Sequence, residues 1–284
     1  MANCSLCGRK LPPLTFGKKI CQWCEQHQAA QRGELPDDAP QPVMAAPWVR
    51  RQSSGAVTNA ILGVNVAVFV GMLIAGVPIE GNSPGLGEQL VHWGANFGPY
   101  TLSGQWWRLL TSVFVHIGII HIAFNMWGLW NLGAACESLY GSWSYCAVYL
   151  ICGIGGSVGS VTWRPFGLSA GASGAIFGIA GALVGSYYFG EFSMPRFAVS
   201  ARLRMLLLYM GFGLFFGATQ ANVDNAAHIG GLLTGLALGA LIAKIAPGED
   251  DIGRRLAILG VVLSLVIAAF IAVQHHFAPM FGPG

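Results

Sequence analysis

The sequence predicts an all-α polytopic membrane protein, and three observations support this prediction. Of its 284 residues, 54% are hydrophobic and only 10% are charged, whereas a soluble domain carries about 25% charged residues. Glycine occurs 40 times, and small residues let membrane helices approach one another closely. Seven apolar stretches are long enough to cross a bilayer, which takes about 20 residues each. They cover residues 57–77, 112–134, 144–162, 171–189, 205–221, 226–245 and 256–274.

The chain before the first span has a different composition. Residues 1–28 contain two CxxC pairs, and residues 29–55 are rich in Gln, Pro, Ala and Asp. Such a composition is typical of a flexible linker. The membrane region begins at about residue 56, and its longest loop, about 78–111, is rich in Trp and Tyr. Aromatic rings of this kind prefer the water–lipid interface, so we expect this loop to lie there.

Positive charges predict the orientation of the spans. If the N-terminus lies inside, thirteen of the fifteen Lys and Arg residues fall on cytoplasmic segments, and only Arg108 and Arg164 lie outside. The positive-inside rule favours this arrangement. We expect no cleavable signal peptide, because the first 25 residues are polar and lack an apolar segment of the required kind. The predicted protein is integral and multi-pass, with a cytoplasmic N-terminus and an external C-terminal tail.

Cys4, Cys7, Cys21 and Cys24 form the two CxxC pairs, which thirteen residues separate. Four thiolates suit tetrahedral zinc, and the reducing cytosol disfavours disulfides. A segment of this length does not fold stably without such a staple. We therefore predict a structural zinc in a module over residues 1–28. A redox site is the alternative, and His27 could replace one thiolate. The few lysines of the module do not indicate nucleic acid, and they fit a solvated face or attraction to the anionic inner leaflet.

Ionisable side chains inside a membrane are costly, so the few that remain point to function. The predicted spans contain His116, His121 and His228, with Glu137 near the cytoplasmic end of the second span. No Asp or Glu lies near the middle of any span. This pattern, together with the lack of two similar halves, disfavours a small-molecule transporter.

Polar residues begin three spans that enter from the same side. His116, His121 and Asn125 belong to the second span, Ser173 to the fourth and His228 to the sixth, so all five should lie near one depth. The fourth and sixth spans also carry glycine stripes, which either only pack helices or bring these two spans into contact. The stripes are Gly174, Gly178, Gly181 and Gly185 on the fourth span and Gly231, Gly235 and Gly239 on the sixth.

These residue types suit nucleophilic catalysis. A serine hydroxyl becomes reactive when a neighbouring base accepts its proton, and His228 can be that base for Ser173 because burial favours the neutral imidazole. An oxyanion would find donors in the free N–H groups at the start of the fourth helix, including that of Ser173, and in the side chains of His121 and Asn125. Asp224 falls in the outer loop, so we predict a Ser–His dyad without an acidic member.

The same segments resemble the rhomboid family of intramembrane serine proteases. They are His-Ile-Gly-Ile-Ile-His-Ile-Ala-Phe-Asn over residues 116–125, Gly-Ala-Ser-Gly over 171–174, and Ala-His-Ile-Gly-Gly-Leu-Leu-Thr-Gly over 227–235, together with Trp107-Arg108 and Glu137. The resemblance covers about residues 57–245. It implies a six-helix core that hydrolyses transmembrane helices near their outer ends without a metal or cofactor in catalysis.

By position, the resemblance implies that Ser173 is the nucleophile and His228 the base. It implies that His121 and Asn125 stabilise the oxyanion, whereas His116 has a structural role. Phe177 stands where many bacterial members have a tyrosine that packs on the catalytic histidine, so an aromatic face is retained.

The predicted domains are the module over 1–28, the linker over 29–55, the six-span core over 56–245, and a seventh span with a short tail over 246–284. We expect the protein in the bacterial inner (plasma) membrane, with membrane-protein substrates and the lipid bilayer as partners and no nucleic acid. The alternative function is that of a non-catalytic relative, which binds transmembrane helices without cleaving them.

Overall fold

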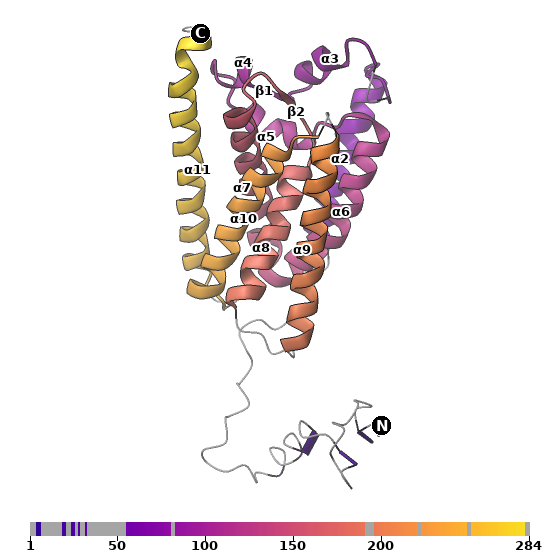
Figure 1. Ribbon diagram of the computed structural model, residues 1–284, viewed down its shortest axis with the longest axis vertical. Coiled ribbons are helices and arrows are strands. Elements are labelled where there is room, and N and C mark those ends of the chain that lie inside the picture. Colours follow the sequence, from indigo (N-terminus) through magenta and orange to yellow (C-terminus); the bar gives the residue numbers. More distant parts are fainter. Residues whose placement is uncertain are drawn as a thin grey trace. The chain divides into compact units, whose positions relative to one another are not determined.

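The computed structural model describes residues 4–6, 19–20, 24–25, 28, 32, 55–80, 83–190, 196–220, 223–248 and 251–281. The chain divides into two compact units, Met1–Met44 and Ala45–Gly284. In the first unit, Cys4 and Cys24 are buried, and the Ser5 N–H donates to the Lys19 carbonyl oxygen at 2.8 Å. The second unit is a bundle of long helices (Figure 1).

Helices occur at each of the seven predicted spans. They are α2 (Ala56–Ile74), α6 (Gly118–Tyr140), α7 (Ser142–Trp163), α8 (Ser173–Phe189), α9 (Arg196–Thr219), α10 (Asn225–Ile245) and α11 (Ile252–Phe281). Among the described residues, five helices are long and apolar enough to cross a membrane by themselves, and α6 passes the same test together with the short helices before it. With 17 residues, α8 is shorter, and most of its side chains are buried. The prediction of a helical polytopic architecture is confirmed.

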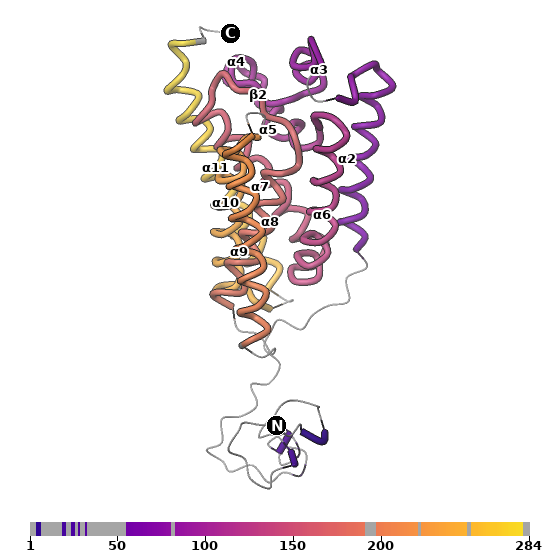
Figure 2. Tube along the Cα trace, turned by 45° about the vertical axis from the view of Figure 1, so that its right-hand side comes forward, coloured from indigo at the N-terminus to yellow at the C-terminus, as the bar shows by residue number. Residues whose placement is uncertain are grey.

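The short elements gather at one end of the bundle, which we call the loop end (Figures 1 and 2). They are α3 (Leu86–His92), β1 (Asn96–Phe97), α4 (Gly98–Thr101), α5 (Arg108–Thr111), η1 (Ser112–Phe114) and β2 (Leu168–Ser169). The two strands pair antiparallel, with Asn96 opposite Ser169 and Phe97 opposite Leu168. This pairing joins the long loop to the segment that leads into α8.

The second span differs from its predicted position. Helix α6 begins at Gly118 rather than at residue 112, and the chain bends by 94° between Arg108–Phe114 and Gly118–Tyr140. Gly118 has a φ of +75°, a left-handed conformation that glycine adopts without steric cost. His116 therefore precedes α6, whereas the sequence placed it within the second span.

Helices α8 and α10 pack with their backbones in close contact. A Cβ added at Gly231, Gly235 or Gly239 of α10 would overlap a backbone carbonyl oxygen of α8. Small residues at such positions let two helices approach in the absence of a hydrophobic driving force between them. The glycine stripes therefore bring the fourth and sixth predicted spans together, with Ser173 and His228 both at the loop end.

Glu137 joins α6 to the start of α2. Its side chain is fully buried and accepts hydrogen bonds from the N–H groups of Val57 and Thr58, at 3.2 and 2.9 Å. The hydroxyls of Thr58 and Ser142 donate to it as well, at 2.7 and 2.8 Å. Since the first N–H groups of a helix have no partner within the helix, this carboxylate caps α2 and fixes it against α6.

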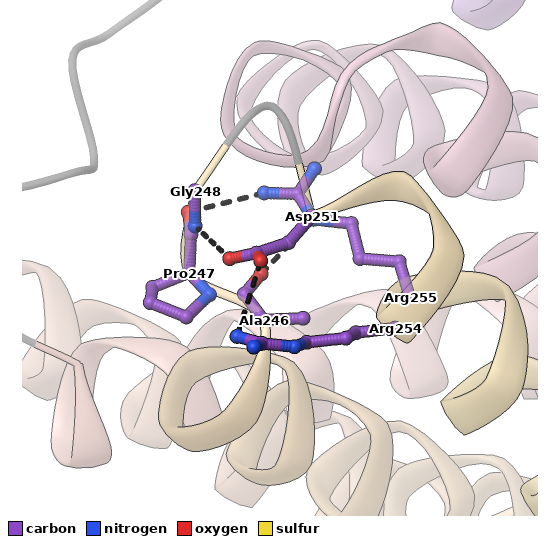
Figure 3. A network of polar contacts seen from close by, with 6 residues as sticks. All are labelled: Ala246, Pro247, Gly248, Asp251, Arg254 and Arg255. Atoms are coloured by element: carbon purple, nitrogen blue, oxygen red, sulfur yellow. Dashed lines mark hydrogen bonds and ion pairs between the residues drawn. The ribbon is translucent and has the colours of Figure 1, made fainter.

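Helix α11 is anchored at both of its ends. Arg255 is 6% exposed and donates to the carbonyl oxygens of Ala246, Pro247 and Tyr140 at 3.0–3.1 Å. Figure 3 shows this arginine beside the turn that follows α10, where Asp251 accepts from the Gly248 N–H at 3.0 Å. At the loop end, Gln274 of α11 donates to the carbonyl oxygen of Leu102 at 2.9 Å. The seventh helix therefore contacts both the core and the long loop.

Candidate active site

Ser173 and His228 meet at the loop end of the α8–α10 contact. Ser173 is the first residue of α8, and His228 lies in the first turn of α10. The Ser173 Oγ lies 2.9 Å from the His228 Nε2, and the imidazole is 5% exposed. A hydroxyl and a ring nitrogen at this distance can form a hydrogen bond, which is the geometry that a serine nucleophile and its base require.

Asn225 determines which ring nitrogen of His228 carries the proton. The Asn225 Nδ2 donates to the carbonyl oxygen of Leu214 at 2.9 Å, so the Oδ1 of the amide is the atom that faces His228. It lies 3.1 Å from the Nδ1. An amide oxygen can only accept, so the proton resides on Nδ1 and Nε2 is free to accept from Ser173.

An aromatic ring fixes the plane of the imidazole. Phe177, one turn below Ser173 on α8, is stacked on His228 with ring centroids 4.2 Å apart and an interplanar angle of 5°. Phe177 is itself 4% exposed. The stacking limits rotation of the imidazole about its Cβ–Cγ bond. The hydrogen bonds at its two nitrogens fix the orientation of the ring within its plane.

His121 is positioned to donate a hydrogen bond beside Ser173. Its Nδ1 accepts from the Ile117 N–H at 3.2 Å, so in the neutral ring the proton resides on Nε2. A Cβ added at Gly171 would lie 2.8 Å from that Nε2, which places the donor next to the segment entering α8. Gly171 has a φ of +123°, and its lack of a side chain leaves this space open.

Asn125 lies one turn further along α6. Its Nδ2 donates to the His121 carbonyl oxygen at 3.1 Å and would lie 3.5 Å from a Cβ added at Gly171. An amide nitrogen has two N–H groups, so one remains for a further acceptor. The backbone N–H groups of Ser173 and Gly174 belong to the first turn of α8, where no earlier helical carbonyl can accept from them.

His116 contacts the backbone rather than the dyad. The Ala172 N–H donates to its Nε2 at 3.4 Å, and its Nδ1 lies 3.2 Å from the carbonyl oxygen of Phe114. The Gly171 N–H donates to the carbonyl oxygen of Ser112 at 2.9 Å. These contacts hold the chain immediately before Ser173 in place.

The side chain of Asp224 caps α10 and makes no hydrogen bond to the imidazole of His228, whose backbone N–H donates to the Asp224 carbonyl oxygen at 3.2 Å. Its Oδ1 accepts from the N–H groups of Ala226 and Ala227 at 3.1 and 3.2 Å, and its Oδ2 accepts from the hydroxyl of Ser160 on α7. Asp is a favoured N-cap residue because its carboxylate satisfies the first free N–H groups of the helix.

Arg108 organises the long loop at the same end. It is 6% exposed and donates to the carbonyl oxygens of Val91 and Ala95 at 2.6 and 3.0 Å. It also donates to the side chain of Gln105 at 2.7 Å, and its guanidinium lies 4.5 Å from the centre of a Trp107 ring. The arginine thus joins α3 to α5.

Sequence reasoning missed one residue of this site, Asn225. The signal was present, because Asn225 precedes His228 by three residues and such positions lie on one face of a helix. What the pattern did not indicate was the Leu214 carbonyl of α9, which orients the amide.

Comparison with known proteins places these observations in a family. A family model described as "Rhomboid domain" matches residues 103–245. Rhomboid protease GluP of Bacillus subtilis is 40% identical over 196 residues, which cover 69% of this chain and 36% of that relative. Rhomboid protease AarA of Providencia stuartii is 32% identical over 208 residues, which cover 66% of this chain and 71% of the relative.

A eukaryotic relative shows a similar match. Rhomboid-like protease 1 of Toxoplasma gondii is 32% identical over 198 residues, or 66% of each chain. The chain therefore spans well under half of the Bacillus relative but about two thirds of the other two. The family model, the relatives and the apolar helices together show that this integral, multi-pass membrane protein belongs to the rhomboid family.

Proposed function

We propose that this chain is an intramembrane serine endopeptidase that cleaves transmembrane segments of membrane proteins near the loop end of the bundle. The observation that supports this function most directly is the 2.9 Å contact between the Ser173 Oγ and the His228 Nε2. Two of the relatives are named rhomboid proteases, and the chain retains both members of the pair. A non-catalytic helix-binding protein would have no need of this arrangement.

In the proposed reaction, His228 Nε2 accepts the hydroxyl proton of Ser173 while the Oγ attacks the scissile carbonyl carbon. The C–N bond then breaks as His228 gives this proton to the leaving amine, and an acyl ester remains on Ser173. Water, activated by His228 in the same way, hydrolyses the ester and restores the hydroxyl. The nucleophile, the base and the oxyanion donors all come from this chain, so the reaction requires no metal or cofactor.

The negative charge of the tetrahedral intermediate would lie beside Gly171. The N–H of Ser173, the Nε2–H of His121 and the free N–H of Asn125 are its proposed donors. Such donors stabilise the transition state because they are fixed before the charge develops. His116, Arg108 and Glu137 then have supporting roles, through the backbone before Ser173, the long loop and the start of α2.

We propose that the loop end faces the outside of a bacterial inner (plasma) membrane, with the N-terminus in the cytoplasm and the C-terminus external. The distribution of Lys and Arg supports this orientation. Substrate helices that contain Gly, Pro or Ala near this surface would be preferred, because helical amides must be released before the backbone can reach Ser173. The proposed domains remain 1–28, 29–55, 56–245 and 246–284, with six spans in the core and one after it.

Labelling with a fluorophosphonate tests the proposed function without knowledge of the substrate. The folded wild type in liposomes should react at Ser173, whereas Ser173→Ala should not react and His228→Ala should react far more slowly. A wild type that stays unlabelled while its thermal unfolding is cooperative would favour the non-catalytic, helix-binding function instead.

Asn125→Ala should slow cleavage without abolishing it. Removing one oxyanion donor typically lowers kcat by about 100–1000-fold, and the Ser173–His228 pair does not depend on Asn125. Steady-state cleavage of a single-span substrate in liposomes would measure the effect. Asn131→Ala is the matched control, since Asn131 of α6 is exposed and donates only to the carbonyl oxygen of Trp127. Equal rates for the two variants would exclude Asn125 from the oxyanion site.

We further propose that Cys4, Cys7, Cys21 and Cys24 bind one structural zinc. The Sγ atoms of Cys4 and Cys24 are 3.9 Å apart, close to the separation of about 3.8 Å that tetrahedral Zn–S bonds of about 2.3 Å produce. It is far longer than a disulfide of about 2.05 Å. Cys7 and Cys21 lie outside the described residues, and no group of three or more candidate metal ligands occurs within those residues.

Metal analysis of the purified full-length protein tests this proposal. We expect one zinc per chain in the wild type and none in the variant with both Cys4→Ser and Cys7→Ser. Cys146→Ser, which changes a half-buried cysteine of α7, should keep the full zinc content. Retention of full zinc by the double variant would contradict the Cys4 site.

A further inference from the structure

We infer that Asn225 is a positioning residue for His228 and that α9 holds it in place. The inference rests on the proposed function and extends it, because it makes the alignment of the dyad depend on a helix that contributes no catalytic residue. Two side chains fix His228, namely Asn225 at the Nδ1 and Phe177 against the ring face. Both are in contact with α9.

The backbone of α9 orients Asn225. The Leu214 carbonyl oxygen accepts from the Asn225 Nδ2 at 2.9 Å, and it is this bond that turns the Oδ1 toward His228. Without it, the amide could rotate and present its N–H groups to Nδ1. The proton on the imidazole would then shift to Nε2, the atom that must accept from Ser173.

Two glycines let α9 approach these side chains. A Cβ at Gly217 would overlap the Oδ1 of Asn225 and would lie 2.9 Å from its Cγ. A Cβ at Gly213, one turn away on the same face of α9, would lie 2.6 Å from the Cζ of Phe177. Gly211 differs from both, because a Cβ there would meet no atom within 4 Å. Glycine at 213 and 217 is thus a requirement of the contact with the residues that hold His228.

Helix α9 is otherwise loosely held. Only 11% of an apolar 18-residue stretch of α9 is buried, compared with 61% for the corresponding stretch of α7. Phe212, Phe215 and Phe216 are 50–71% exposed. The side chain of Leu214 is partly buried against the core, and further from the loop end Arg202 donates to the Tyr187 hydroxyl at 3.1 Å. A displacement of α9 at the loop end would therefore break the Leu214–Asn225 bond at small cost elsewhere, and His228 would lose its orientation.

Four variants of the full-length protein in liposomes test this inference: Asn225→Ala, Gly217→Ala, the double variant of these two, and Gly211→Ala. Loss of one neutral hydrogen bond is worth about 1 kcal/mol, which is about fivefold in rate, so we expect kcat to fall about fivefold for Asn225→Ala, with KM within about twofold. Gly217→Ala should give a similar loss, because Oδ1 is the atom that must move away. Gly211→Ala should keep the wild-type rate.

The double variant distinguishes a shared contact from two independent defects. Asn225→Ala removes the Oδ1 and Cγ atoms that a Cβ at Gly217 would crowd, so that of its three nearest neighbours the Cγ1 methyl group of Val223 remains, at 2.9 Å. We therefore expect the double variant to be no slower than Asn225→Ala alone, as for two changes that act through one interaction. Losses that multiply would overturn the inference.

The pH profile gives a readout that a purely structural residue would not move. Asn225→Asp keeps an acceptor at the His228 Nδ1 but adds a negative charge, which stabilises the imidazolium. The acid limb of the kcat profile should therefore move to higher pH. Asp224 of α10 and His121 of α6, the other titratable groups that influence His228, are unchanged in every variant.

The outcomes separate this inference from the proposed function. An active wild type with unchanged kcat and pH profile in Asn225→Ala and Asn225→Asp would overturn the positioning role alone. A folded wild type that neither reacts with a fluorophosphonate nor cleaves would overturn the proposed function, and this inference with it.

Discussion

Ser173→Ala should abolish cleavage of a labelled single-span substrate. The variant keeps the helix start, the oxyanion donors and His228, but it removes the atom that attacks the scissile carbonyl. Loss of the nucleophile in a soluble serine protease lowers kcat by about 10⁶-fold, so the product should fall below detection. Gel analysis of the substrate after incubation with purified protein in liposomes would measure the effect.

Two further variants complete this experiment. His228→Ala should be equally inactive, because the hydroxyl then lacks its proton acceptor. Ser264→Ala is the matched control, since Ser264 of α11 is exposed and donates only to the carbonyl oxygen of Gly260; it should cleave at the wild-type rate. Cleavage by Ser173→Ala at the wild-type rate would show that the product comes from another protease or another residue.

Gly231→Ala should inactivate the protein without changing any polar group. Gly231 lies close to the dyad on α10, and a Cβ there would overlap the carbonyl oxygen of Gly174. The two helices must separate to admit the methyl group, and the 2.9 Å contact between Ser173 and His228 lies at the same end of this interface. Because a misplacement of about 1 Å can cost about 100-fold in rate, we expect at least that loss.

Stability measurements would show whether Gly231→Ala loses activity because α8 and α10 separate near Ser173 and His228. Overpacking a close contact typically destabilises by about 1–3 kcal/mol, so the thermal unfolding temperature should fall. Gly239→Ala overlaps the carbonyl oxygen of Ala182 in the same way but further from Ser173, and it should lower stability with a smaller loss of activity. Gly260→Ala, where a Cβ meets no atom within 4 Å, is the control. Activity of Gly231→Ala at the level of this control would contradict the proposed role of the α8–α10 contact.

Hydropathy located the helices because the bilayer imposes a length and an apolar composition on each span. It placed the start of α6 wrongly, since residues 112–117 are as apolar as the helix that follows them. The 94° bend there depends on the left-handed conformation of Gly118 and on the contacts of His116 with the backbone around it. Neither feature changes the mean hydropathy of the segment, so hydropathy could not reveal the bend.

The candidate site was likewise predicted from the sequence only in part. The sequence placed Ser173 and His228 at the same ends of two glycine-striped spans, which made their contact an expectation. It also indicated His121 and Asn125 as further oxyanion donors near the same depth. The role of Asn225 could not be read in the same way, because its amide is oriented by a backbone carbonyl of α9, and a carbonyl group is common to every residue type.

The sequence by itself determined the membrane-spanning character of this protein, its rhomboid motifs and the identity of the groups that could carry out the chemistry. These properties follow from side-chain type and from periodicity along a single helix. Only the tertiary structure decided that Asp224 caps α10 and leaves the Nδ1 of His228 to Asn225, and that α9 orients this asparagine. The physical reason is that a hydrogen bond depends on distance and direction between atoms of different helices, which the packing of those helices sets.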